Sequence, residues 1–165
     1  MRSVLFVRHA KSSWDNASVS DFDRSLNERG KKDAQEMAKH LINRKVPLDS
    51  FISSPAKRAK KTAVFFSEAY GLHESAILLK PELYLPETES FYEVLEQAPD
   101  KRMHLAVFSH NPGITDFVNG LTDEIKVDNV PTTGIFAIKV DIKSWRDFRH
   151  AQKNFWFFDY PKNHL

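Results

Sequence analysis

The sequence contains no cysteine among its 165 residues. Disulfide bonds, thiol nucleophiles and metal sites built on cysteine are therefore excluded. No apolar run reaches the roughly 20 residues that a membrane-spanning helix needs. The short apolar run near the N-terminus is interrupted by Arg8 and His9, which is too early for the core of a signal peptide. These absences predict a cytoplasmic protein that has no membrane partner.

The chain also has little excess charge, with a formal net charge of +2. No basic stripe with interleaved aromatic residues accompanies this charge, so we expect no nucleic-acid partner. With 165 residues and without a linker, an internal repeat or a low-complexity tract, the chain is typical of a single domain spanning 1–165. The absence of a heptad pattern or an obvious apolar interface favours a monomer.

Short β-prone runs alternate with apolar patterns of helical period along the chain. Strands are predicted at 4–7, 51–54, 77–79, 105–108 and 135–140, with an edge strand within 145–160. Helices are predicted after Gly30 with an apolar face that extends to Ile42, and at 55–70, 88–97 and 113–121. This alternation is typical of an α/β fold, so we expect a three-layer α/β/α domain with a mainly parallel sheet.

Three of the predicted strands end in polar turns that suit a phosphoryl group. The first ends at Arg8 and His9, the second runs into Ser53–Arg58, and the third into Ser109–Gly113. In open α/β sheets, ligands bind beyond the carboxyl ends of the strands, so these segments should meet in one cleft. Guanidinium groups match the charged oxygens of a phosphoryl group, helix N-termini add N–H donors, and an imidazole can attack phosphorus. The pattern therefore predicts phosphoryl chemistry.

Four blocks of the sequence resemble, in order, those of the histidine phosphatase superfamily, also called phosphoglycerate-mutase-like. The blocks are Val7–Lys11, with RHA in place of the usual RHG, Leu26–Gly30, Ser53–Thr62 and Ser109–Gly113. RHA alone is a weak tripeptide signal, but four blocks in the family's order, spread over residues 4 to 121, are a specific one. The short chain, the RHA variant and the SHNPG turn resemble the SixA-like branch of bacterial phosphohistidine phosphatases.

This resemblance implies a phosphoglycerate-mutase-like fold and a phosphatase that forms a phosphohistidine intermediate without a cofactor. At the matching positions it implies His9 as the nucleophile and Arg8 and Arg58 as phosphate clamps, with His110 completing the pocket. The implied substrate is a phosphohistidine-bearing protein, such as a phosphorelay or phosphotransfer domain in signal transduction, and the product is inorganic phosphate. No histidine–carboxylate spacing predicts a metal site, and neighbouring arginines would repel a divalent cation, so we expect no metal.

Three further residues are candidates for contact with the phosphoryl group. Ser12 and Asn16 lie in the polar segment that follows His9, and Asn111 directly follows His110. A segment rich in serine and asparagine is more often a solvated loop, so a structural role stays open for Ser12 and Asn16.

Larger members of the superfamily supply a carboxylic acid from the region after the second helix, where it protonates an oxygen leaving group. The matching region here, Leu79–Glu87, has an apolar residue at the expected position, and Glu82 and Glu87 are the nearest candidates for the acid. A strong acid matters most for an alkoxide, whereas an imidazole leaves more readily because its ring nitrogen ordinarily has a pKa of ~6.5. The missing acid therefore favours an N–P bond over an O–P bond.

Two other functions stay open. A small-molecule phosphomonoesterase of the same superfamily would use Glu82 or Glu87 as its acid, and its rates on ester substrates would identify it. A non-catalytic phosphohistidine-binding adaptor would bind a phosphorylated partner without releasing phosphate. His9 argues against the adaptor, because binding alone needs no nucleophile.

Overall fold

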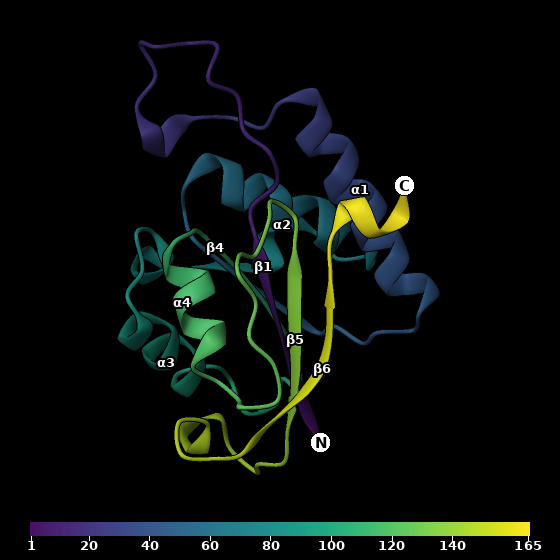
Figure 1. The fold of residues 1–165 in the computed structure, drawn as a ribbon, viewed down its shortest axis with the longest axis vertical. Helices are drawn as coiled ribbons and strands as arrows, with labels where there is room; N and C mark the ends of the chain where they lie inside the picture. The colour runs from purple at the N-terminus through teal and green to yellow at the C-terminus, as the bar shows by residue number, and fades with distance from the viewer.

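The computed structural model describes all residues from Met1 to Leu165, and one six-stranded sheet runs through the molecule (Figure 1). The strands are β1 (Arg2–Arg8), β2 (Ser50–Ser53), β3 (Ile77–Leu79), β4 (His104–Ser109), β5 (Ile135–Val140) and β6 (Lys153–Asp159). Their order across the sheet is β3-β2-β4-β1-β5-β6. The first four strands pair in parallel, whereas β5 pairs antiparallel with both β1 and β6. The mainly parallel sheet and the C-terminal edge strand are thus confirmed.

Helices cover both faces of the sheet. They are α1 (Glu28–Asn43), α2 (Lys57–Ala69), α3 (Thr88–Glu96) and α4 (Gly113–Asn119). α1 and α2 pack together on one face, and α3 and α4 pack together on the other (Figure 1). The three-layer α/β/α expectation is therefore confirmed. None of these helices combines the length and the apolar character that crossing a membrane requires.

The central strand β1 is buried on both faces, which explains its continuous apolar sequence. Val4 and Phe6 face the core under α3 and α4, while Leu5 and Val7 face the core under α1 and α2. Phe6 packs edge-on against Phe117 with ring centroids 5.2 Å apart. Burial of one such phenylalanine contributes about 1.5–3 kcal/mol, so the strand that carries the first site residues is firmly anchored.

Some predicted boundaries and faces are wrong in detail. α2 begins at Lys57 with Ala56 as its N-cap, so Pro55 lies before the helix and not in its first turn. Ile42 is 39% exposed, because it lies about 100° round α1 from the buried Leu41. The edge strand predicted within 145–160 is confirmed at Lys153–Asp159, and a 3-10 turn at Trp145–Asp147 precedes it.

Candidate active site

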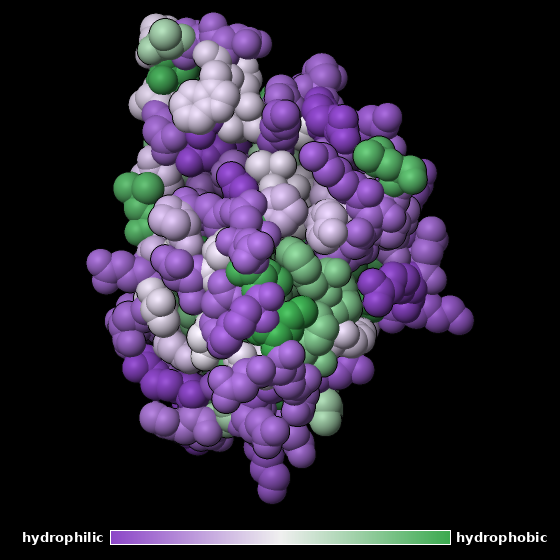
Figure 2. Space-filling view, in the orientation of Figure 1, coloured by the Kyte–Doolittle hydropathy of each residue, from purple (hydrophilic) through white to green (hydrophobic).

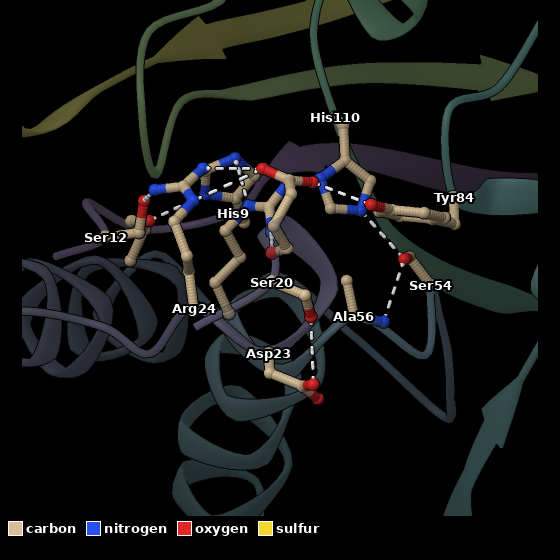
Figure 3. A network of polar contacts seen from close by, with 12 residues as sticks. His9, Ser12, Ser20, Asp23, Arg24, Ser54, Ala56, Tyr84 and His110 are labelled. Carbon is tan, nitrogen blue, oxygen red and sulfur yellow. Dashed lines mark hydrogen bonds and ion pairs between the residues drawn. The ribbon is translucent and has the colours of Figure 1, made fainter. Parts of the chain in front are cut away.

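The parallel pairing of β1 and β4 brings two histidines together. Arg8 lies opposite Ser109 in the register of the two strands, so His9 and His110 leave the sheet side by side at its carboxyl edge. The His9 amide donates to the Ser109 carbonyl at 3.1 Å. The centroids of the two imidazole rings are 5.1 Å apart, and both rings lie among polar side chains (Figure 3).

The His9 ring is held in a single tautomer. Its Nδ1 lies 2.7 Å from the Ala10 carbonyl oxygen. A carbonyl can only accept, so Nδ1 carries the proton and Nε2 keeps its lone pair. Burial, and to a smaller extent the charges of Arg58 and Arg8, lowers the pKa of His9 to about 4, against a raising effect of the Ala10 hydrogen bond. The ring is therefore neutral at pH 7, with Nε2 available as a nucleophile.

Arg58 projects from the first turn of α2 and contacts the nucleophilic edge of His9. Its Nε lies 3.4 Å from His9 Nε2. Its two terminal nitrogens donate to Asp21, Nη1 to the backbone oxygen at 2.6 Å and Nη2 to Oδ2 at 3.1 Å. The residue is only 4% exposed. The guanidinium is thus fixed beside the lone pair of His9, where it can bind an oxygen of a phosphoryl group.

Asp21 gathers three donors on one carboxylate. Its Oδ2 accepts from the Tyr84 hydroxyl at 2.7 Å, and its Oδ1 lies 3.2 Å from Arg24 Nη2. The hydrogen bond from Tyr84, with the charges and hydrogen bonds of Arg58 and Arg24, lowers the pKa of Asp21 to about 2 despite partial desolvation. This carboxylate therefore stays ionised at neutral pH and anchors the loop between His9 and α1 to the cleft.

Arg8, the last residue of β1, has a donor to spare. Its Nη1 donates to the Val130 carbonyl at 3.1 Å, but its Nε is buried without a partner. Burial, and then the charge of Arg58, lowers the pKa of Arg8, although an arginine stays protonated at neutral pH. An unpaired buried N–H costs about 1–3 kcal/mol, so a ligand oxygen that accepted it would remove that penalty.

His110 is supported by a serine from the end of β2. His110 Nε2 lies 2.7 Å from Ser54 Oγ, which itself accepts from the Ala56 amide at 3.2 Å (Figure 3). The Ser54 hydroxyl has no other acceptor for its hydrogen, so we assign that hydrogen to His110 Nε2 and the ring proton to Nδ1, which is buried without a partner. Burial, and then His9 and Arg58, lowers the pKa of His110 to about 3. The neutral ring offers Nδ1–H as a second unused donor.

These side chains line a cleft of about 460 Å³. Four of its lining residues are cations and one is an anion, namely Arg8, Lys11, Arg24, Arg58 and Asp21. The rest of the lining is His9, Ser12, Trp14, Leu85, His110, Asn111 and Thr132. No group of three or more histidine and carboxylate side chains is placed to hold a metal ion. Such a cationic cleft, rich in donors, suits a phosphoryl group.

Two of the three weaker phosphate candidates reach the cleft. Ser12 and Asn111 line it, whereas Asn16 does not. Ser12 Oγ accepts from Arg24 Nη1. The Asn111 amide is fully engaged, because its Nδ2 donates to Asn129 and Val130 and its Oδ1 accepts from Thr115. The polar contacts of Asn111 therefore hold the turn after β4 in shape.

Neither glutamate considered as a general acid lines the cleft. Glu82 is exposed in the 3-10 turn Pro81–Leu83. The Glu87 side chain caps α3, where it accepts from the backbone of Ser90. Glu87 thus serves the helix N-terminus, and the member of this segment that does line the cleft is the apolar Leu85.

Sequence reasoning missed the residues that hold the predicted ones in place. Ser54 supports His110, and Tyr84 contacts Asp21 from 63 residues away, a separation across which no local pattern relates two residues. Arg24 had a local signal, since it lies three residues after Asp21 and the two form an ion pair. These contacts of Asp21 order the loop between His9 and α1.

Residues 4–84 match the family model of the histidine phosphatase superfamily, branch 1. An uncharacterized chloroplastic protein of Arabidopsis thaliana is 32% identical over 84 residues, which are 50% of this chain and 38% of that protein. Phosphoserine phosphatase 1 of Hydrogenobacter thermophilus is 39% identical over 74 residues, which are 44% of this chain and 34% of that enzyme. The matched parts thus span little more than a third of these curated relatives.

The fold of the whole chain is similar to that of the protein histidine phosphatase SixA, whose structure was solved with tungstate. The TM-score is 0.83 at 24% sequence identity, and the similarity covers 99% of each chain. The likeness extends beyond the matched residues 4–84 to the C-terminal strands, so the complete sheet with its covering helices is shared.

Proposed function

Because the chain belongs to the histidine phosphatase superfamily, we propose that it is a metal-independent phosphatase that hydrolyses phosphohistidine on proteins through a phospho-His9 intermediate. The substrate class is a phosphorelay or phosphotransfer domain of a signalling pathway, and the compartment is the cytoplasm. One domain, residues 1–165, carries the whole site. The fold shared with SixA supports this substrate class.

In the first step, the lone pair on His9 Nε2 attacks phosphorus. Water first protonates the other ring nitrogen of the substrate's phosphohistidine, so the electron pair of the broken P–N bond goes to a ring that leaves as neutral imidazole. In the second step, water attacks phospho-His9, and the electron pair of its N–P bond returns to Nε2. The phosphate leaves with both protons of the water, and its ionisation at neutral pH returns to solvent the proton that the substrate imidazole took. The proton on Nδ1, held by the Ala10 carbonyl, stays in place throughout.

Two kinds of donor bind the phosphoryl oxygens. Some have no acceptor in the free protein, and another already lies beside the nucleophile. Arg8 Nε and His110 Nδ1 are buried without partners. Arg58 already stands beside His9 Nε2. Donors placed in advance around the spreading negative charge of a phosphoryl transition state stabilise it without reorganisation.

The observation that carries the choice of an N–P bond is the state of Asp21. It is the one carboxylate that lines the cleft, and hydrogen bonds and arginine charges lower its pKa to about 2. An acid that is ionised at neutral pH cannot protonate a departing alkoxide. A departing imidazole has no such need, because water protonates the other ring nitrogen near neutrality and the ring then leaves as neutral imidazole.

A second candidate is hydrolysis of small phosphomonoesters. The 39% identity with part of a phosphoserine phosphatase supports it. This alternative would require a protonated carboxylic acid in the cleft, but Asp21 is ionised and Glu82 and Glu87 lie outside the cleft.

The test is phosphate release from a phosphohistidine-bearing protein beside p-nitrophenyl phosphate, with EDTA present. We expect release mainly from the N–P substrate, and the His9→Ala variant should retain less than about one-thousandth of it, as for other removed nucleophiles. Full activity in that variant would overturn the intermediate. Equal or faster release from the ester would favour the phosphomonoesterase, and loss of activity in EDTA would overturn metal independence.

A further inference from the structure

Two apolar side chains stand exposed at the mouth of the cleft. Trp14 is 76% exposed and Leu85 is 71% exposed, whereas the other exposed large hydrophobic residues inside the chain lie at 36–41%. Both line the cleft that holds His9. Because neither is buried, neither contributes appreciably to the stability of the fold, and their place beside the cleft requires another explanation.

Trp14 is exposed but held in position. The Arg24 guanidinium lies over its ring, 3.5 Å from the centroid, and Arg24 is itself bound to Asp21 and Ser12. The loop that carries Trp14 projects beyond the sheet at the upper end of the molecule in Figure 1, and hydrophobic and near-neutral atoms lie there among hydrophilic ones in Figure 2. A fixed, exposed tryptophan loses little entropy when a partner covers it.

Leu85 is held outward by a strained backbone. Its φ is +50°, a value that costs a leucine about 1–2 kcal/mol, and the following proline disfavours the right-handed helical conformation at this position. Pro86 packs so closely on α4 that a Cβ at Gly113 would lie 2.4 Å from the Pro86 oxygen. The segment is therefore wedged against the helix, and Leu85 is presented at the cleft.

We propose that Trp14 and Leu85 form a docking rim for the polypeptide that carries the phosphohistidine; this inference rests on the proposed function. His9 and His110 are only 7% and 2% exposed, so the phosphoryl group must enter the cleft deeply. A histidine side chain is short, so the backbone that carries it is drawn against the rim. The partner therefore presents apolar side chains next to its phosphohistidine, which contact Trp14 and Leu85 while its phosphoryl group meets the cationic floor.

The experiment compares phosphohistidine in a folded carrier protein with the free amino acid phosphohistidine, which has the same N–P bond but no polypeptide. Trp14→Ala and Leu85→Ala should each lower kcat/KM for the protein about tenfold, mainly through KM, as truncation of an interface anchor does. Both should leave kcat/KM for the free amino acid within about twofold, since neither residue bonds the phosphoryl group. Leu79→Ala, at a leucine that is 41% exposed on β3 and outside the cleft, is the matched control and should change neither rate.

The possible failures are distinguishable. The docking rim is overturned if both rim variants keep wild-type kcat/KM on the carrier protein, or if their kcat/KM falls equally on the carrier protein and on free phosphohistidine. Either result leaves the proposed phosphatase function intact. If the wild type releases phosphate from neither N–P substrate, the proposed function is wrong, and the docking proposal that rests on it is wrong as well. Circular dichroism of each variant confirms that a lost rate does not come from a lost fold.

Discussion

At the scale of single residues, the cleft combines permanent cations with imidazoles that stay neutral. Arg8 and Arg58 provide positive charge that does not depend on pH near neutrality. The same charges, added to burial, keep His9 unprotonated. A protonated His9 would bind phosphate well but would have no lone pair for attack, so the arginines favour the nucleophilic state as they bind the anion.

We therefore predict an unusual titration of His9 in the free protein. Its ring resonances should shift with a midpoint at about pH 4, because burial and then Arg58 and Arg8 disfavour the charged form. His110 should titrate at about pH 3, because burial and then His9 and Arg58 disfavour its charged form. NMR of the ring protons against pH measures both midpoints, and the His9→Gln variant assigns the signal. A midpoint near ~6.5, the ordinary value for histidine, would show that the ring is open to solvent.

Single-residue chemistry is the part most accessible from the sequence. His9, Arg8, Arg58 and His110 stand out because they end strands or begin a helix, and the structure brings all four into one cleft. The role of Glu87 cannot be predicted from the sequence. Its side chain caps α3 and is therefore not available to the site, and this depends on where the helix begins. The exposure of Leu85 cannot be predicted from the sequence for a similar reason, because both its exposure and its positive φ depend on packing in the folded protein.

At the scale of elements, the start of α1 supports the loop that follows His9. Asn27 caps this helix, and its Oδ1 accepts from the Gly30 amide at 2.8 Å. A Cβ at Gly30 would lie 2.1 Å from the Lys11 carbonyl oxygen, and the Asn27 amide donates to that same oxygen at 3.0 Å. The helix and the segment after His9 thus approach more closely than any side chain at position 30 allows.

Gly30→Ala should therefore destabilise the protein and displace Lys11. Overpacking of this kind costs about 1–3 kcal/mol, and because Lys11 lies two residues after His9, kcat should fall together with stability. Urea denaturation measures the first effect, and phosphate release without denaturant, at a temperature well below the unfolding transition, measures the second. A variant as stable and as active as the wild type would show that the segment after His9 can move aside freely.

Gly120→Ala is the matched control. The nearest atom to a Cβ there is the Phe117 oxygen at 3.5 Å, an ordinary contact, and Gly120 does not have a positive φ. We expect a change in unfolding free energy within about 0.5 kcal/mol, as for a surface substitution. A loss equal to that of Gly30→Ala would mean that glycine flexibility, and not the contact with Lys11, sets the result.

The type of each element is predictable here because its apolar residues recur with a clear strand or helix period. The residues at which the elements begin and end are not predictable in this way. The apolar run at 4–7 and the helical spacing of Phe91, Val94 and Leu95 each favour one kind of element. The ends depend on contacts that form only in the folded chain, because neither Ala56 before α2 nor Ser144 before the turn Trp145–Asp147 makes a side-chain cap that the sequence could reveal. The parallel order β2-β4-β1 follows from long-range pairing, for which the sequence supplies only the general expectation of neighbouring strands.

At the scale of the whole molecule, a nearly neutral chain concentrates positive charge at one edge of its sheet. The formal net charge is only +2, yet the cleft is lined by four cations and one carboxylate. Parallel strands achieve this concentration because their carboxyl ends, with the residues that follow them, share one edge. The net charge of such a protein therefore does not indicate whether it binds an anion, whereas the topology of its sheet indicates where the cations gather.

This concentration predicts that inorganic phosphate stabilises the folded protein. A ligand that binds only the native state at 100 times its Kd adds about 2.7 kcal/mol, which for a chain of this size raises Tm by about 5–10 °C. Differential scanning calorimetry in phosphate, against sodium chloride at equal ionic strength, measures the shift. Arg58→Gln should abolish most of it, whereas Arg149→Gln, which removes an arginine paired with Glu89 and Glu96 outside the cleft, should preserve it. Equal shifts in phosphate and chloride, or an unchanged shift in the Arg58 variant, would mean that the cleft does not bind the anion as its geometry indicates.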